Sequence, residues 1–491
     1  MLGQVYVSIV GVIFIPIYID MLGNEAYGLV AVFSMLQAIF AILDFGLTPT
    51  ISRETSLYLS GSISSILYKK LRKLLFVIFL GIGLSFSASL LFLSHHIAMN
   101  WLNYETLSAK DVINSIQLMI LCCFFRWMSG IYRGVISGAE DFKWLSLFNM
   151  ISSSLKFIGV FLSMMIFGTK AEIFFLHQLA VAIIELIILF NKSSKCARND
   201  EPVSDDIKIS YTDEFRKIWK FSLSIAFTSG IWLFITQLDK ILLSGILSLK
   251  EYGYFTVAVL LANGIFMISG PISQAIMPRM ASLYAQDKSY DLKQLYMRST
   301  KNVTILAGSA SLLIVALPKT ILSLWTGDNI LSMETANILR LYSIGNMFLT
   351  ISAFAYYLQY ARGNLYYHLF GNTLLLFILT PSIVIAAYYF GSIGAGFVWL
   401  IANFLFLFLW VGYVHYKLEP GLHKYWIVDG FIKIIIPGGI ISFLVALYLD
   451  DISSSVILKL IKIISVGLIL MFLSFLLSRV DTHFTHAFKG K

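Results

Sequence analysis

Long apolar runs separated by short polar segments make up most of this chain, a pattern typical of membrane-spanning helices. An α-helix needs about 20 predominantly apolar residues to cross the hydrocarbon core of a bilayer. Fourteen runs approach this length, and they predict spans at 2–22, 26–49, 74–94, 112–136, 145–167, 172–190, 221–244, 253–277, 302–324, 335–359, 366–390, 393–415, 431–449 and 455–478. We therefore expect an all-α polytopic membrane protein with about 14 transmembrane helices.

The composition excludes an ordinary soluble protein. Only 13% of the 491 residues are charged and 58% are hydrophobic, whereas a soluble domain carries about 25% charged residues. The three cysteines, Cys122, Cys123 and Cys196, have neither the number nor the spacing of a disulfide framework or a metal site. We expect them to be small buried hydrophobic residues.

The basic residues predict how the chain is oriented in the membrane. Most Lys and Arg residues fall in alternate loops, and loops with such an excess are cytoplasmic. Both termini are then cytoplasmic, as are the two largest polar segments, 191–220 and 278–301. The net charge of +9 therefore reflects topology and gives no reason to expect a nucleic-acid partner.

An internal repeat joins the two parts of the chain. Tyr27-Gly28 matches Tyr252-Gly253, and "ISRETSLY" (51–58) matches "MPRMASLY" (277–284), so that Arg53 corresponds to Arg279. The offset of about 225 residues covers six spans. Because six is even, both copies enter the membrane in the same direction and are related by a pseudo-two-fold axis along the membrane normal.

The repeat predicts four parts of the chain. Two six-helix halves cover 1–195 and 221–416, and a cytoplasmic linker at 196–220 joins them. Two additional helices and a cytoplasmic tail occupy 417–491. Transporters built from parallel repeats bind their cargo between the halves, and Arg53 and Arg279 are then a repeat-related pair at the inner mouth.

Several charged residues fall inside predicted spans, where a charge at mid-bilayer costs about 2.5–3.5 kcal/mol unless it faces water or protein. The cations Arg126, Arg133, Lys156 and Arg340 each share a helix face with polar neighbours. Such stripes predict a cationic, water-filled cavity. The acids in comparable positions are Asp44, Glu185 and Asp239, which are candidates for ion coupling.

A structural interpretation competes with the cavity. Glu185 can pair internally with Lys156, and Arg133 and Arg340 can extend to an interface. Cations outnumber acids at depth, however, and a balanced set of structural pairs would leave no such surplus. A cationic cavity predicts an anionic cargo, and arginine suits phosphate because its planar guanidinium binds two oxygens and keeps its charge.

Motifs of enzymes and of ATP-driven pumps do not occur in the sequence. No GxxxxGK[ST], HExxH, GxSxG or CxxC is present, and we expect no catalytic residues, no cofactor and no metal site. The acidic pairs Asp205-Asp206 and Asp450-Asp451 fall in polar loops, where we expect solvated acids. The protein is therefore not expected to be an enzyme.

The first hairpin, "MLGNEAYGLVAVFSMLQAIFAILDFGLTPTISRETSLY" (21–58), resembles the bacterial polysaccharide flippases that translocate O-antigen and capsule repeat units. These belong to the superfamily that also contains the MATE drug exporters. "LDKILLSGILSLKEYGYFTVA" (238–258) resembles the matching hairpin of the second half, and "YRGVISGAEDF" (132–142) fits the loop after span four. The resemblance covers nearly the whole chain and carries over no functional residue.

The resemblance implies a V-shaped bundle of two halves that alternates between inward- and outward-facing states under an ion gradient. It implies an undecaprenyl-diphosphate-linked oligosaccharide as cargo and the bacterial inner membrane as location. Membrane lipids are further partners, as are the polymerase and chain-length regulator of the same pathway.

Three rival interpretations remain open. A MATE-like exporter of small amphiphiles has the same architecture but suits a neutral or acidic lumen. A twelve-span sugar symporter also has six-plus-six halves, although its usual basic loop between spans two and three is not visible. A membrane polysaccharide polymerase or ligase usually presents a large external loop, and the predicted external loops here are short.

Overall fold

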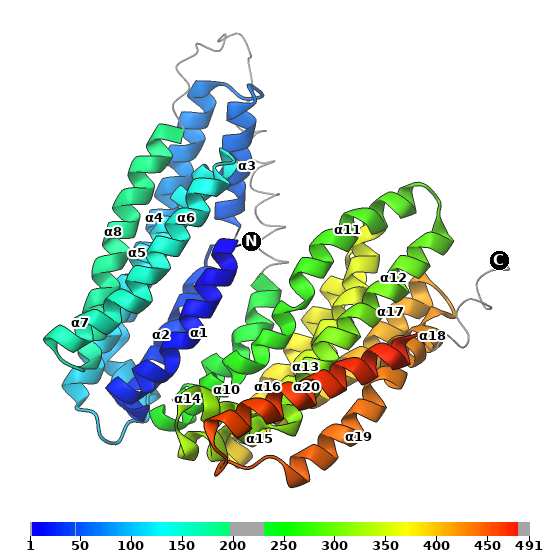
Figure 1. Cartoon of the computed structure of the whole chain (residues 1–491). Helices are drawn as coiled ribbons and strands as arrows, with labels where there is room; N and C mark the ends of the chain where they lie inside the picture. Colours follow the sequence, from blue (N-terminus) through cyan, green and yellow to red (C-terminus); the bar gives the residue numbers. More distant parts are fainter. Residues whose placement is uncertain (1, 45, 197–229, 480–491) are drawn as a thin grey trace. The chain divides into compact units, whose positions relative to one another are not determined.

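The computed structural model describes residues 2–44, 46–196 and 230–479, and every regular element in these ranges is a helix (Figure 1). The chain divides into two compact units, Met1–Gly253 and Tyr254–Lys491, here called unit 1 and unit 2. The predicted limits of the two halves follow the repeat and stay predictions. Nearly all of the predicted linker, 197–220, and most of the tail lie outside the described residues.

Unit 1 consists of long and short helices, with two π-helical segments labelled η. The elements are α1 (Leu2–Leu22), α2 (Asn24–Ile42), α3 (Leu47–Leu59), α4 (Ser65–His96), η1 (Ile97–Trp101), α5 (Ala109–Gly138), α6 (Phe142–Ser154), η2 (Leu155–Gly159), α7 (Val160–Phe167) and α8 (Ala171–Cys196). Residues 230–243 form a further helix, and α10 (Leu249–Met267) begins in unit 1. Helix α5 is central, because it packs against α2, α3, α4 and α8.

Unit 2 is built around the long helix α15. Its elements after α10 are α11 (Ser269–Ala285), α12 (Ser289–Val303), η3 (Thr304–Gly308), α13 (Ser309–Ala316), α14 (Pro318–Thr326), α15 (Asn329–Ala361), α16 (Tyr366–Leu405), η4 (Phe406–Trp410), α17 (Val411–Leu418), α18 (Leu422–Ile427), η5 (Val428–Ile432), α19 (Lys433–Tyr448) and α20 (Val456–Ser478). Helix α15 packs against α11, α13, α14 and α16. Several of its buried residues, such as Phe354 and Leu358, belong to the core of the unit.

The helices confirm an all-α multi-pass membrane protein. Eleven helices in the described ranges are long and apolar enough to cross a membrane, and the shorter apolar helix 6–22 adds to them. One of the eleven, Tyr366–Leu418, covers two predicted spans. Gly391, with φ +59°, interrupts the helical backbone between them. With residues 230–243 in predicted span seven, this arrangement is consistent with about 14 transmembrane helices.

The second predicted span, 26–49, is wrong in its extent. Helix α2 ends at Ile42, and α3 begins at Leu47 after a break at Gly46, whose φ is +72°. Only glycine adopts this left-handed conformation without steric cost. Pro49 in the first turn of α3 has no N–H to continue a helix from α2. Asp44 therefore lies in a turn, where its Oδ1 accepts hydrogen bonds from the Thr48 backbone N–H at 3.1 Å and from the Thr48 hydroxyl at 2.8 Å.

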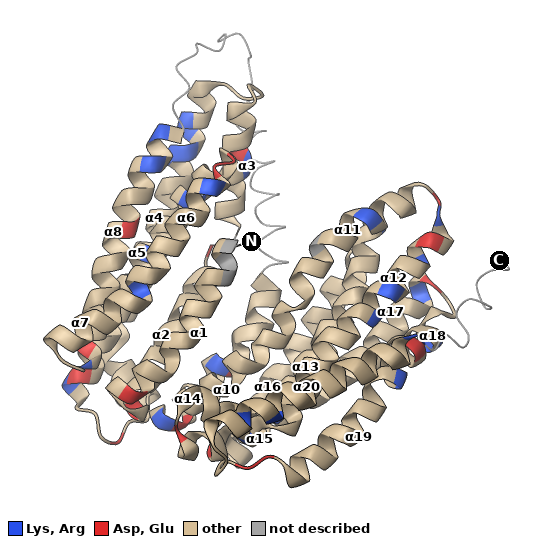
Figure 2. Ribbon diagram, in the orientation of Figure 1, with Lys and Arg blue, Asp and Glu red and all other residues tan. Residues whose placement is uncertain are grey.

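The internal repeat is visible in the helix boundaries. Helix α2 begins at Asn24 and α10 at Leu249, which is the same offset of 225 residues as the matching Tyr-Gly pairs. A shorter helix follows in each case, α3 and α11, and these carry Arg53 and Arg279 respectively. Figure 2 shows the charged residues mainly near the ends of the helices, with a few at mid-length in unit 1.

Candidate functional site

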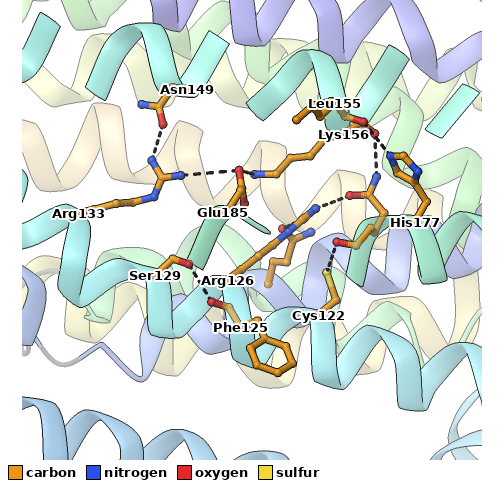
Figure 3. A network of polar contacts seen from close by, with 12 residues as sticks. Cys122, Phe125, Arg126, Ser129, Arg133, Asn149, Leu155, Lys156, His177 and Glu185 are labelled. Carbon is orange, nitrogen blue, oxygen red and sulfur yellow. Dashed lines mark hydrogen bonds and ion pairs between the residues drawn. The ribbon is translucent and has the colours of Figure 1, made fainter. Parts of the chain in front are cut away.

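Two parallel helices of unit 1, α5 and α8, carry matching polar positions. Arg126 and Arg133 lie seven residues apart on α5, and Gln178 and Glu185 lie seven residues apart on α8. Arg126 Nη2 donates to Gln178 Oε1, and Arg133 Nη2 lies 3.9 Å from Glu185 Oε1. Because seven residues are about two helical turns, both pairs face each other along one seam. The seam places the two arginines predicted from the sequence in one network (Figure 3).

Lys156 joins this network from a π-helical turn. It lies in η2, and its Nζ is 2.7 Å from Glu185 Oε1. A π-turn displaces carbonyl groups from the regular α-helical pattern, and two of them accept from α8 side chains. Gln178 Nε2 donates to the Lys156 carbonyl at 2.9 Å, and His177 Nε2 donates to the Leu155 carbonyl at 3.0 Å (Figure 3). The local helix defect thus fixes the position of the lysine.

Arg133 has a second polar neighbour on the next helix. Its Nη1 donates to Asn149 Oδ1 of α6, and its guanidinium lies over the Phe148 ring at 5.4 Å. Glu185 is 3% exposed, so its carboxylate pairs with Lys156 and Arg133 where little water reaches it. The internal pairing of Glu185 with Lys156, which the sequence left open as an alternative, is present.

Arg126 differs from the other two cations, because none of the described carboxylates pairs with it. Its Nη1 donates to Gln37 Oε1 of α2 at 2.7 Å, and its Nη2 donates to Gln178. Its guanidinium also lies 5.1 Å from the centroid of the Phe33 ring. All of these contacts are with uncharged groups. The network therefore contains three cations and one carboxylate, and its excess positive charge resides at Arg126.

A cavity of about 460 Å³ opens beside Arg126 within unit 1. Arg126 and Gln37 give it one polar side, Asp44 lies on its wall, and Trp127 and Phe79 stack at 3.7 Å as part of its apolar lining. The cavity thus combines a cation with no carboxylate partner, an acid and aromatic rings. Its geometry suits an anionic group that is held through a guanidinium.

Arg340 occupies a different environment in unit 2. Its Nη2 lies 3.2 Å from Asp450 Oδ2, and its Nε donates to the Val315 carbonyl at 3.1 Å. Asp450 Oδ1 also accepts from the backbone N–H of Thr320 at 3.0 Å. The expectation that Asp450 is a solvated loop acid is wrong, since its side chain is 1% exposed. The turn between α19 and α20 brings this acid onto α14 and α15, where it anchors the hairpin.

The remaining predicted residues do not join the network around Arg126. Asp239 is 2% exposed and accepts from the backbone N–H of its neighbour Lys240 at 2.8 Å. Arg53 Nη1 lies 2.7 Å from Glu54 Oε1, and Glu54 is buried whereas Arg53 is half-exposed. Arg279 is exposed on α11. Their predicted roles at the inner mouth and in ion coupling stay predictions.

Three polar members of the network were not predicted from the sequence. Gln37, Gln178 and His177 are neither Asp, Glu, Lys nor Arg, the residue types that mark a charge within a span. The spacing of Gln178 and Glu185 was an available signal, because it repeats the spacing of Arg126 and Arg133. In the part of the chain that the structure describes, no group of three or more His, Cys, Asp or Glu residues is placed to hold a metal ion.

Comparisons with known proteins agree with this architecture. The profile of a family described as polysaccharide biosynthesis protein matches residues 1–284. A Shigella flexneri protein named "Putative O-antigen transporter" is 20% identical over 342 residues, covering 67% of this chain and 75% of that protein. An uncharacterized membrane protein of Methanocaldococcus jannaschii is 27% identical over 299 residues, covering 58% of this chain and 67% of its own length.

Two solved structures show the same fold. The lipid II flippase MurJ in an inward-closed conformation superposes with a TM-score of 0.72 at 15% identity, covering 96% of this chain and 97% of its own. A multidrug-resistance MATE family transporter of the MOP superfamily in an inward-facing conformation gives a TM-score of 0.67 at 13% identity, covering 85% and 96%.

Proposed function

The chain belongs to the polysaccharide biosynthesis protein family, and from this membership we propose that it flips lipid-linked oligosaccharide repeat units across a membrane. The cargo is an undecaprenyl-diphosphate-linked oligosaccharide for O-antigen, capsule or exopolysaccharide synthesis. Transport proceeds by alternating access in the bacterial inner membrane, with both termini cytoplasmic. The family membership and the relative named as an O-antigen transporter support this proposal.

The observation that carries the proposal is the uncompensated charge at Arg126. A charge within a membrane span normally faces water or protein groups that stabilise it, and the partly buried Arg126 is held by the neutral amides of Gln37 and Gln178 beside a 460 Å³ cavity. A guanidinium held by neutral oxygens can exchange them for phosphate oxygens, which bind about twice as strongly because they are charged. The diphosphate of the cargo supplies such oxygens.

The other predicted residues receive roles around this step. Arg133 and Lys156 add positive potential along the seam, while Glu185 limits the net charge that must be desolvated. Asp44 lines the cavity of Arg126 and is our first candidate for proton or sodium coupling, ahead of Glu185 and Asp239. Arg340, Arg53 and Arg279 remain proposed contacts for the cargo elsewhere on its path.

Export of small cationic amphiphiles by a MATE-like mechanism suits this cavity less well. A cation would have to enter beside Arg126, where like charges repel. The polymerase and chain-length regulator of the same pathway are proposed partners, because they would act on the glycan after it is flipped.

The test is complementation in a strain that lacks its own translocase for the matching glycan. Arg126→Ala removes the charge, Arg126→Lys keeps it, and Arg298→Ala removes an exposed arginine of α12 as the matched control. Surface polysaccharide is scored on gels, and protein abundance by immunoblot. We expect at least a tenfold loss for alanine, partial activity for lysine and wild-type activity for the control.

Wild-type glycan levels from Arg126→Ala at normal abundance would contradict the proposal. A flipping assay in proteoliposomes with a labelled undecaprenyl-diphosphate-linked sugar separates transport from later steps. Loss of this in vitro flipping in Arg126→Ala, with the folded protein retained in the bilayer, assigns the defect to translocation.

A further inference from the structure

A second cavity of about 390 Å³ lies in unit 1 between α4 and α8, over the surface of α5. Lys69, Arg72 and Lys73 line it from α4, and Ser193 and Ser194 add two hydroxyl groups from α8. None of its described lining residues is acidic. Both hydroxyls donate to the Phe190 carbonyl, so the cavity presents three cations to one ligand, and this charge suits a phosphate group.

The floor of this cavity is apolar and aromatic. The Tyr132 ring of α5 lies between Phe76 of α4 and Phe190 of α8, with ring centroids 6.5 Å and 5.5 Å away. Ile131 and Val135 complete the floor. A small hydrophilic anion would leave this surface uncovered, whereas an amphipathic molecule would cover both the cations and the floor.

The cavity lies at the end of α4 where the membrane-spanning part of the helix begins, which is the level of the lipid headgroups. The basic residues occupy the second and third turns of the helix, and the apolar stretch of the span begins directly after them at Leu74. The neighbouring faces of α4 and α8 expose apolar side chains that suit contact with lipid. Val77 of α4 is 55% exposed and Ile187 of α8 is 54% exposed. The charges thus lie where phospholipid phosphates meet the hydrocarbon core.

A nearby lysine shows what a structurally paired cation looks like in this region. Lys192 of α8 lies 2.6 Å from Asp141 Oδ2, and this hydrogen bond holds the pKa of Asp141 below its ordinary value. Asp141 in turn accepts from the Trp144 backbone N–H at the start of α6. The cations that line the cavity have no such carboxylate among the lining residues.

We propose that this cavity binds the headgroup phosphate of an anionic phospholipid, with an acyl chain lying along the exposed apolar faces of α4 and α8. Basic pockets between transmembrane helices on the cytoplasmic side bind anionic lipid headgroups by the same physics. Arg126 does not line this cavity, so the lipid site is separate from the proposed cargo site and does not depend on the transported molecule.

Native mass spectrometry of the purified full chain in detergent tests this site. Phosphatidylglycerol and phosphatidylcholine are titrated separately, and retained lipid is counted. A triple variant, Lys69→Gln with Arg72→Gln and Lys73→Gln, removes the basic wall. A charge-matched control, Lys288→Gln with Arg298→Gln and Lys424→Gln, removes three exposed cations of unit 2. A third protein exchanges the wall conservatively as Lys69→Arg, Arg72→Lys and Lys73→Arg.

We expect wild type, the control and the conservative exchange to retain phosphatidylglycerol in preference to phosphatidylcholine. The triple glutamine variant should lose affinity roughly a hundredfold, because each Lys or Arg at an anionic lipid surface contributes about fivefold. Equal retention of the two lipids by wild type overturns the proposal, as does undiminished phosphatidylglycerol binding by the triple variant.

A second arm separates a lipid from free phosphate. Thermal stability of wild type is measured with phosphatidylglycerol and, separately, with millimolar inorganic phosphate at constant ionic strength. Stabilisation by the lipid alone supports the proposal. Equal stabilisation by inorganic phosphate that disappears in the triple variant assigns the cavity to a soluble anion and overturns it.

Discussion

Helix α5 of unit 1 and helix α15 of unit 2 are each the fourth span of their repeat, and their central polar contacts differ in charge. Arg126 and Asn346 both lie 17 residues after the first residue of their helix. Arg126 binds Gln37 of α2, and Asn346 donates through Nδ2 to Asn263 Oδ1 of α10 at 3.0 Å. At the same distance from the start of the fourth span, one unit thus has a cation and the other a neutral amide.

The third member of each contact extends this correspondence. Gln178 of α8 accepts from Arg126, while Trp399 in the part of α16 after Gly391 donates through Nε1 to Asn346 Oδ1 at 2.9 Å. Unit 2 ties three helices together with neutral groups at this level. A charge is therefore not needed to join three helices at this level, and this is consistent with the proposed binding role of Arg126.

The second polar centre of unit 2 is also neutral. Tyr296 of α12 is 2.7 Å from His415 Nε2, and His415 Nδ1 is 3.1 Å from His423 Nδ1. Trp426 Nε1 donates to the Thr300 hydroxyl at 2.9 Å in the same cluster. Aromatic and imidazole groups fill this cluster, and the ion pairs of unit 2, such as Arg340 with Asp450, lie elsewhere.

The largest expected effect comes from removing the single carboxylate of the unit 1 network. Glu185→Gln leaves Lys156 and Arg133 without a counter-charge, and breaking a buried pair in this way costs about 3–5 kcal/mol. We expect a large drop in the thermal unfolding temperature of the purified protein. Glu172→Gln, at an exposed position on the same helix, is the matched control.

A double variant makes this prediction specific to charge. Glu185→Gln combined with Lys156→Gln should recover most of the lost stability, because both members of the closest pair are then neutral. If Glu185→Gln alone unfolds at the wild-type temperature, the network is not held by this ion pair.

Exchanging Arg126 of α5 and Asn346 of α15, each in a separate variant, should affect different properties: protein abundance in unit 2 and transport in unit 1. Asn346→Arg places an uncompensated charge at a position that is 1% exposed, at a cost of about 2.5–3.5 kcal/mol on the insertion scale. We expect low abundance of this variant by immunoblot. Arg126→Asn makes unit 1 resemble unit 2 and should keep normal abundance while losing glycan transport.

The predictions for Asn346→Arg and Arg126→Asn can be contradicted independently. Normal abundance of Asn346→Arg would show that unit 2 also tolerates a cation at this level. Loss of Arg126→Asn from the membrane would show that Arg126 is needed for folding, and the functional comparison between the units would then be wrong.

A smaller effect is expected from giving Arg126 the carboxylate that it lacks. Gln37→Glu replaces the amide whose Oε1 accepts a hydrogen bond from Arg126 at 2.7 Å with a carboxylate. The new ion pair should leave thermal stability unchanged or raised, yet it competes with an anionic cargo. We expect transport in proteoliposomes to fall about tenfold, which corresponds to about 1.4 kcal/mol.

The control for this variant is Gln117→Glu, which adds the same charge on α5 at a distance of nine residues from Arg126. Transport by Gln37→Glu at the wild-type rate would exclude Arg126 as an anion-binding residue. A rise in transport would indicate a cationic cargo.

The smallest effect concerns the neutral core of unit 2. Tyr296→Phe removes the hydroxyl beside His415, and a net hydrogen bond of this kind contributes about 0.5–1.5 kcal/mol. We expect a modest fall in thermal stability with transport unchanged, while Tyr388→Phe, at a residue that is 78% exposed, should have no effect. Loss of transport without loss of stability would give this cluster a functional role that the neutral scaffold does not predict.

Much of the fold could be read from the sequence because membrane helices have a strong local signal. The fourteen apolar runs follow from bilayer thickness alone, and the repeat follows from residue identities. The break at Gly46 was also readable in principle, since glycine and proline stand close together at 46–49. The expected span overran it because the surrounding residues remain apolar.

The candidate site was predictable only in part. Residue type and depth identified Arg126, Arg133, Lys156 and Glu185 as unusual, and the sequence indicated that cations outnumber acids. Charge and burial are local properties of a span, so one chain suffices to detect them.

The amino-acid sequence alone was enough to predict the helical membrane architecture, its repeat and the presence of charged residues within the spans. Tertiary structure decided which cations have carboxylate partners. Arg133 and Lys156 meet Glu185, Arg340 meets Asp450, and Arg126 meets only amides and an aromatic ring. These pairings depend on which helices become neighbours and at what register, and residues far apart in the chain carry no local signal of that contact.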